Sequence, residues 1–219
     1  MKSCTSIVFD LDGTLADTSS CIVEAAHYVS SILRLPTVED EAIRSKIGQP
    51  LGPMLASLFS IDGRVIDQAI EEYSIEYRRL AKTDERLFNG SIPLLKAVRS
   101  AGFKMAIATG KSQQGAEHAT ARMGIQSWFD SIHGILPGTP GKPDPAVLVR
   151  AMNALGEPPE SCIMVGDTTF DLDLAQAVGV RTAAVSWGVH STEKLLSRSP
   201  NFMAMNFQEL EQWLLAQRS

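Results

Sequence analysis

The sequence lacks several features that would assign it to a specialised class. Its 219 residues contain no basic run and carry a net charge of -5, which argues against nucleic acid as a partner. No apolar run approaches the length that crosses a membrane. The N-terminus has neither the basic nor the apolar region of a signal peptide. These absences predict a cytoplasmic protein that binds neither nucleic acid nor membranes.

Cysteine is also scarce. Cys4, Cys21 and Cys162 lie far apart, form no CxxC pair and cannot all be joined, as expected for a reducing compartment. The rest of the composition is ordinary, with 44% hydrophobic and 21% charged residues. A chain of this length and composition buries a good core and forms one or two domains.

The most informative stretch lies near the N-terminus. The apolar run 7–9 predicts a buried strand, and Asp10 and Asp12 follow it. Side chains alternate along an extended chain, so both carboxylates project to the same side before Gly13 allows a turn. Two like charges at the end of a buried strand are costly unless a cation, a proton or a ligand offsets them. We interpret the pair as a nucleophile and a proton-transfer group beside a metal; the alternative is a strand that ends in a polar turn.

Apolar periodicity divides the rest of the chain into two kinds of region. Residues 17–82 predict about four helices and no strand, whereas the remainder alternates between helices and strands. Expected helices are 17–33, 38–47, 54–59, 64–82, 91–102, 112–123, 143–155, 171–178 and 207–217. Expected strands are 7–9, 103–108, 129–134, 162–165, 181–186 and 202–205. The alternation predicts an α/β fold with a central parallel sheet and right-handed crossovers.

This division predicts a domain boundary on each side of the helical block. Residues 1–16 and 84–219 would form the α/β core, and residues 17–83 an all-helical insertion after the first strand. The expected hinges are residues 13–16 and 83–90.

Polar residues gather where the predicted strands end, which is where open parallel sheets bind ligands. Thr109 and Gly110 follow the second core strand, Lys142 precedes a helix, and Asp167 follows a later strand, with Asp171 four residues on. Together with the first pair, four carboxylates and one lysine would converge. That surplus of negative charge suits Mg²⁺, a hard cation with oxygen ligands, and the remaining groups suit a phosphate. The pattern predicts a phosphoryl-transfer site.

These residues resemble the four motifs of the haloacid dehalogenase-like hydrolase superfamily, in the phosphoglycolate phosphatase-like branch with a helical cap. The motifs occur in order: Asp10-Leu11-Asp12-Gly13-Thr14; Thr109 with Gly110; Lys142; and Gly166-Asp167 with Asp171. The resemblance implies a Rossmann-like three-layer core with the first strand central, and a cap that closes over the site.

The resemblance also implies the role of each residue. Asp10 attacks phosphorus and forms an aspartyl-phosphate, and Asp12 protonates the leaving oxygen and then activates water. Mg²⁺ is held by the Asp10 carboxylate, the Asp12 backbone carbonyl and Asp167. Asp171 either binds a metal-bound water or orients Lys142. The phosphoryl group is bound by Thr109, Gly110 and Lys142.

Some positions separate the branches of this superfamily. The dehalogenases and the phosphonatases lack the second aspartate of the first motif, so Asp12 favours phosphoryl chemistry. The phosphomutases carry a histidine twelve residues after the nucleophile, where this chain has Ile22. We expect Lys111 only to cap the helix after it and Arg44 to be solvated, and we expect Trp187 and His190 to pack at the rim of the site.

The sequence therefore predicts a Mg²⁺-dependent phosphatase that hydrolyses a small phosphorylated metabolite, with phosphoglycolate as the first candidate. A phosphomutase, a pyrophosphatase and a non-catalytic phosphate-binding regulatory protein stay open as alternatives. The sequence also leaves open whether the protein is a monomer or a homodimer.

Overall fold

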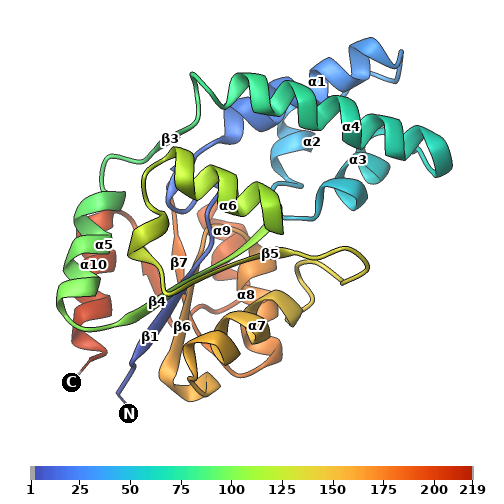
Figure 1. Ribbon diagram of the computed structural model, residues 1–219. Coiled ribbons are helices and arrows are strands. Elements are labelled where there is room, and N and C mark those ends of the chain that lie inside the picture. Colours follow the sequence, from blue (N-terminus) through green and yellow to red (C-terminus); the bar gives the residue numbers. More distant parts are fainter. Residues whose placement is uncertain (1–2, 219) are drawn as a thin grey trace.

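A six-stranded parallel sheet organises the protein, whose computed structural model describes residues 3–218 (Figure 1). Its order is β5-β4-β1-β6-β7-β8, so β1 is central, as expected for a Rossmann-like core. The strands are β1 (Ser6–Phe9), β4 (Lys104–Ser112), β5 (Ser131–Ile135), β6 (Cys162–Gly166), β7 (Arg181–Val185) and β8 (Phe202–Ala204). All four residues of β1 are buried, because helices cover both faces of the sheet.

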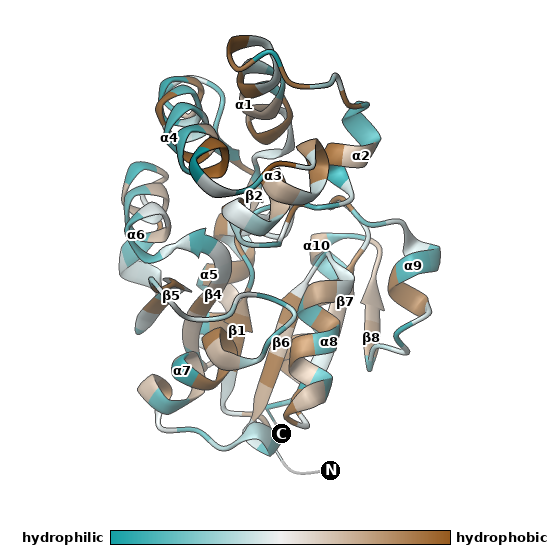
Figure 2. Ribbon diagram, turned by 90° about the vertical axis from the view of Figure 1, so that its right-hand side faces the viewer, coloured by the Kyte–Doolittle hydropathy of each residue, from teal (hydrophilic) through white to brown (hydrophobic). Residues whose placement is uncertain are grey.

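The two faces of the sheet bury different residues of the same strand. Ile7 and Phe9 pack into one hydrophobic cluster, and Val8 packs into another, as the two-residue period of a strand requires. The first cluster joins the sheet to α5 (Ser91–Ser100), α6 (Gln113–Arg122) and α10 (Phe207–Ala216). The second joins it to α7 (Ala146–Leu155) and α8 (Thr169–Ala177). The predicted three-layer α/β architecture is therefore confirmed, and Figure 2 shows the hydrophobic character of β1 and β6 between the helices.

Four helices between β2 and β3 stand to one side of the six-stranded sheet (Figure 1). They are α1 (Ser19–Ile32), α2 (Asp40–Arg44), α3 (Leu51–Phe59) and α4 (Gly63–Leu80). Their apolar faces form a hydrophobic cluster of their own that includes Val29, Ile43, Leu55 and Ala69. We therefore propose that residues 17–83 are a cap inserted into a core of residues 1–16 and 84–219.

Some expected helices differ from the structure in their bounds, and one helix was not expected. The expected helix 38–47 is regular only over α2, because the backbone after it continues in hydrogen bonds to the third preceding residue, as at Lys46 and Ile47. The helix expected from residue 143 begins at Ala146, whose backbone N–H donates to Asp144. The short helix α9 (Thr192–Leu196) is not apparent from the apolar pattern.

A second, two-stranded sheet is a further difference. β2 (Ala16–Asp17) pairs in antiparallel fashion with β3 (Arg86–Leu87), so the expectation of no strand within 17–82 is wrong at Asp17. Arg86 and Asp17 also form an ion pair at 3.2 Å. Two residues carry no local strand signal, and this pairing depends on the two connections between the helical block and the core running side by side. No helix within residues 3–218 is long and apolar enough to cross a membrane.

The helical cluster predicts a test of the proposed cap. Leu55 is fully buried in it, so Leu55→Ala should lower the free energy of unfolding by about 2–5 kcal/mol, measured by chemical denaturation. Val65→Ala is the control, because Val65 is 43% exposed and its truncation should cost less than about 0.5 kcal/mol. Equal losses for the two variants would contradict the packing described for these helices.

Candidate active site

The carboxyl ends of the two central strands bring three carboxylates together. Asp10 follows β1 and Asp167 follows β6, and the two strands are neighbours in the sheet. The side chain of Asp171, from the first turn of α8, lies beside them, and ligand atoms of all three lie within 4.8 Å of one another. All three are at most 1% exposed. Asp167 lies 157 positions along the chain from Asp10, and the fold brings the two carboxylates together, as the sequence predicts.

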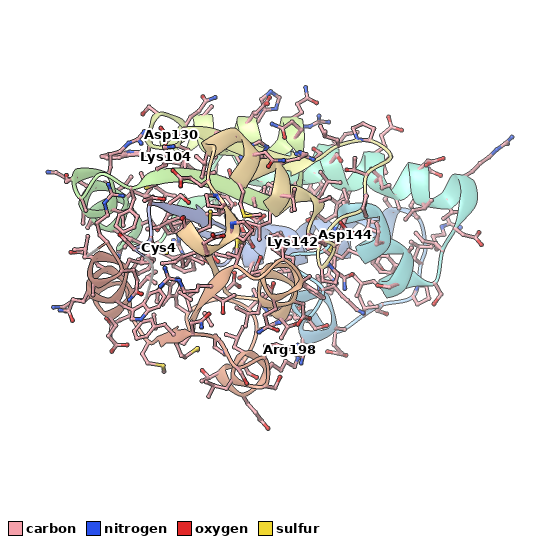
Figure 3. All side chains as sticks on the ribbon, turned by 90° about the horizontal axis from the view of Figure 1, so that it is seen from below. Cys4, Lys104, Asp130, Lys142, Asp144 and Arg198 are labelled. Carbon is pink, nitrogen blue, oxygen red and sulfur yellow. The ribbon has the colours of Figure 1, made fainter. Side chains whose placement is uncertain are left out.

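Lys142 supplies the positive charge at this cluster. Its ammonium nitrogen lies 2.8 Å from Asp10 Oδ1 and donates a hydrogen bond to Asp171 Oδ1 at 2.5 Å. In Figure 3 it lies toward the middle of the molecule, whereas Lys104 lies near the edge. Burial alone would lower the pKa of Lys142, but the charges of Asp10 and Asp171 outweigh burial and raise the pKa. Lys142 is therefore a permanent cation in this site.

Asp171 has a defined task in this arrangement. Its Oδ2 accepts hydrogen bonds from the backbone N–H and the hydroxyl of Thr168, which closes a capping box at the start of α8. Its Oδ1 accepts from Lys142. With both oxygens engaged, the geometry favours the second of its two expected roles, the orientation of Lys142.

Asp167 is held from two sides. Its Oδ1 accepts from the Thr14 hydroxyl at 2.7 Å, and its Oδ2 accepts from the backbone N–H of Val189 at 2.8 Å. Burial, followed by the charge of Asp171, raises the pKa of Asp167 to about 7. The side chain is fixed in direction while its ionised form is disfavoured, as in a site built to receive a cation.

Asp10 is the least satisfied group of the cluster. Among residues 3–218, only Lys142 pairs with the Asp10 carboxylate, at 2.8 Å from Oδ1, and Oδ2 has no partner. Burial raises the pKa of Asp10 well above its ordinary value, and the neighbouring carboxylates add to the effect. A buried oxygen without a partner is costly, and Asp10 together with the neighbouring Asp167 offers the carboxylate ligands that suit a hard divalent cation such as Mg²⁺.

Asp12 lies apart from this cluster and has different partners. Its Oδ1 accepts from the Thr18 hydroxyl at 2.6 Å and forms an ion pair with Lys111 at 3.0 Å. The expectation that Lys111 only caps the next helix is therefore wrong: Ser112 caps α6, accepting from the backbone N–H of Gly115. No local sequence pattern identified this pairing, because β4 is irregular between Ala108 and Ser112.

Thr109 and Gly110, two of the expected phosphate-binding residues, lie at the end of β4 under the loop of residues 48–50. Thr109 is 1% exposed, and its hydroxyl accepts from the backbone N–H of Lys111. A Cβ on Gly110 would overlap the carbonyl oxygen of Gly48, and a Cβ on Gly141 would overlap the Pro50 ring. The loop of residues 48–50 therefore rests directly on both segments, which leaves no room for side chains there.

Trp187 and His190 form hydrogen bonds with backbone groups near the site. Trp187 donates from Nε1 to the Thr14 carbonyl and, with Arg44, lines a cavity of about 130 Å³ beside Gly13. None of Asp10, Asp12 and Lys142 lines this cavity. His190 accepts at Nδ1 from the backbone N–H of Thr169, and its Nε2 lies 3.2 Å from the carbonyl oxygen of Ser45 in the cap. Trp187 and His190 therefore contact the backbone of the loops beside the site, at Thr14, Thr169 and Ser45.

Arg44 differs from its expectation. It is half-buried and donates to the Ser19 hydroxyl instead of being fully solvated.

Comparisons with known proteins agree with this geometry. The family model described as haloacid dehalogenase-like hydrolase matches residues 7–185. A probable phosphatase, IndB of Dickeya dadantii, is 32% identical over 93% of this chain and 90% of its own. The pyrophosphatase PpaX of Bacillus pumilus is 28% identical over 94% of each chain. Among solved structures, the haloacid dehalogenase-like family protein SP0104 of Streptococcus pneumoniae superposes with a TM-score of 0.87 at 31% identity, covering 97% of this chain and 99% of its own.

The buried cluster of Asp10, Asp167 and Asp171 predicts that Mg²⁺ raises the stability of the folded protein. A cation bound only by the folded protein should raise Tm by about 5–10 °C at one hundred times its Kd, measured by thermal unfolding. Asp167→Asn should remove most of this increase, because it removes a charged ligand. Asp173→Asn is the matched control, since Asp173 lies on α8 but pairs with Arg198. An unchanged increase in the Asp167 variant would place the cation elsewhere.

Proposed function

The chain belongs to the haloacid dehalogenase-like hydrolase family, and we propose that it is a Mg²⁺-dependent phosphatase of small phosphorylated metabolites. The observation that carries the proposal is Asp10, a buried carboxylate whose Oδ1 pairs with the Lys142 ammonium at 2.8 Å and whose Oδ2 has no partner among residues 3–218. A carboxylate with one unpartnered oxygen beside a fixed cation suits attack on phosphorus, because the cation attracts the anionic phosphoryl group towards the nucleophile.

The proposed reaction has two steps. In the first, an Asp10 oxygen forms a bond to phosphorus, the bond to the leaving oxygen breaks, and Asp12 gives its proton to that oxygen. In the second, Asp12 removes a proton from water, which attacks the aspartyl-phosphate, releases phosphate and regenerates Asp10. The Thr18 contact supports this role, because it holds the Asp12 carboxylate in one orientation.

The other groups would bind and neutralise the phosphoryl oxygens. The Thr109 hydroxyl, the Gly110 backbone N–H and the Lys142 ammonium are the proposed donors. Asp10, Asp167 and the Asp12 backbone carbonyl would hold Mg²⁺, which when bound neutralises charge that develops on the transferring group. Lys142 keeps its orientation through Asp171.

The names of the relatives suggest which substrates to test first. Phosphoglycolate is the first monoester to test, and inorganic pyrophosphate is the second candidate because of the likeness to PpaX. A phosphomutase is disfavoured, since Ile22 packs in the helical cluster where the mutases carry a histidine. The three cysteines are free and buried, which supports the proposed cytoplasmic location. The small-metabolite partner and the monomeric or homodimeric state stay predictions.

A substrate panel tests this function. Phosphoglycolate, pyrophosphate, sugar phosphates and p-nitrophenyl phosphate should be assayed for phosphate release with and without Mg²⁺. We expect Mg²⁺-dependent release from at least one of them. Isomerised product without free phosphate would identify a mutase, and binding without turnover of any compound would favour the regulatory alternative.

The nucleophile can be tested separately. Asp10→Asn should lower kcat by at least about 10³-fold, because an amide cannot form the covalent intermediate, while circular dichroism should show an intact fold. Asp173→Asn, which changes an exposed ion pair on α8, should keep full activity. Substantial turnover in the Asp10 variant would assign the nucleophile to another residue.

A further inference from the structure

Lys111 is a buried lysine that the proposed reaction does not yet use. Its side chain is 14% exposed, and its ammonium nitrogen lies 3.0 Å from Asp12 Oδ1. The same nitrogen donates to the Tyr77 hydroxyl at 2.9 Å and lies 4.4 Å from the centroid of the Tyr77 ring. Lys111 belongs to β4 of the core and Tyr77 to α4 of the proposed cap. The Lys111 side chain therefore connects Asp12 of the core to the proposed cap.

The contacts continue beyond Tyr77. Its hydroxyl donates to Glu85 Oε1 at 2.8 Å, and Glu85 accepts from Arg122 of α6. The Tyr77 ring stacks on Tyr73, with centroids 5.9 Å apart, inside the apolar cluster of the cap. Tyr77 is therefore fixed by packing and by hydrogen bonding, and it offers Lys111 a rigid partner.

The position of Lys111 depends on these partners. Burial alone would lower its pKa, but the charges of Asp12 and Glu85 raise it above the ordinary value. A buried ammonium whose partner is removed costs several kcal/mol, so the side chain has little freedom to leave. The aromatic face adds a weaker attraction.

The contacts on Asp12 are one-sided. Thr18 and Lys111 both bind Oδ1, and no group of residues 3–218 hydrogen-bonds Oδ2. Oδ1 is thus anchored from α1's N-terminal side and from β4, while Oδ2 stays available for proton exchange. An anchored carboxylate loses less entropy when it reaches the reacting oxygen.

We propose that Lys111 is a positioning residue for Asp12, and that Tyr77 of the cap holds Lys111 in place. The inference rests on the proposed function, and it adds a second role for the cap. When the cap is seated, α4 fixes the lysine that orients the proton-transfer group, so the position of the cap affects proton transfer through a chain of side chains. Asp12, Lys111 and Tyr77 form this chain.

The first experiment uses the wild-type protein and Lys111→Met, which keeps an apolar stem of similar length and removes the charge. For an alkyl phosphate monoester, kcat should fall by about 10–100-fold while KM changes less than about 3-fold, because the loss affects proton transfer and not binding. Tyr77→Phe keeps the ring over the ammonium and loses the hydroxyl, so kcat should fall by about 3–10-fold.

The leaving group distinguishes positioning from general damage. p-Nitrophenolate departs without a proton, whereas an alkoxide requires one from Asp12. Lys111→Met should therefore reduce kcat/KM for the alkyl ester at least about tenfold more than for p-nitrophenyl phosphate. Equal reductions would overturn the inference, and Tyr77→Phe repeats the comparison if the lysine variant folds poorly.

A double-mutant cycle tests the route through Asp12. In an Asp12→Asn background, Lys111→Met should cause no further loss of turnover, since the group it positions is gone. Independent losses that multiply would overturn the inference. Lys104→Met is the matched control: Lys104 begins the same strand and pairs with Glu157 at 2.8 Å, so its loss should leave the ratio between the two esters unchanged.

Failure of the proposed function has a different signature. If the wild-type protein releases no phosphate from any ester, both proposals are overturned. If it is active and Lys111→Met matches Lys104→Met in every kinetic constant, only the role of Lys111 is overturned. Thermal unfolding of the wild type, Asp12→Asn, Lys111→Met and the double variant supplies a readout without turnover. The two single changes in Tm should not add in the double variant, and additive changes would overturn the coupling between Lys111 and Asp12.

Discussion

Electrostatic repulsion among buried carboxylates is the constraint on which the site depends. Asp10, Asp167 and Asp171 lie together with one ammonium, that of Lys142, which pairs with Asp10 and Asp171, and all four side chains are at most 2% exposed. Each ion pair recovers part of the cost of desolvation, but one cation cannot neutralise three anions in a medium of low polarity. The surplus makes a divalent cation and a phosphoryl group chemically complementary additions.

The sheet forces these charges together. Parallel pairing of β1 with β6 aligns Phe9 with Val165, so the residues that follow both strands emerge at the same edge. Gly13 lies so close to Asp167 that a Cβ would overlap its carboxylate, and its φ of 77° is in the left-handed region. This crowding of charge has an electrostatic cost, which a bound cation would offset.

The two aspartates of the first motif have separate environments, and this separation fits the separate tasks proposed for them. Asp10 pairs with Lys142, whereas Asp12 is anchored by Thr18 and Lys111. Carboxylates only two residues apart can thus serve as nucleophile and as proton carrier. Tyr77 of α4 contacts Lys111, so the second environment links Asp12 to the helical insertion through one intervening side chain.

Much of the fold and of the candidate site was readable from the sequence. The apolar period over residues 7–9 and the carboxylates after it determine a buried strand with a charged end, because local sterics fix alternation along a strand. The alternation of helices and strands likewise determines a parallel sheet. Tertiary structure alone decided how Lys111 is used, because its partners Asp12 and Tyr77 lie 99 and 34 positions away in the chain and no local pattern encodes such distances. The pairing of Asp17 with Arg86 depends in the same way on two distant segments that only the folded chain brings together.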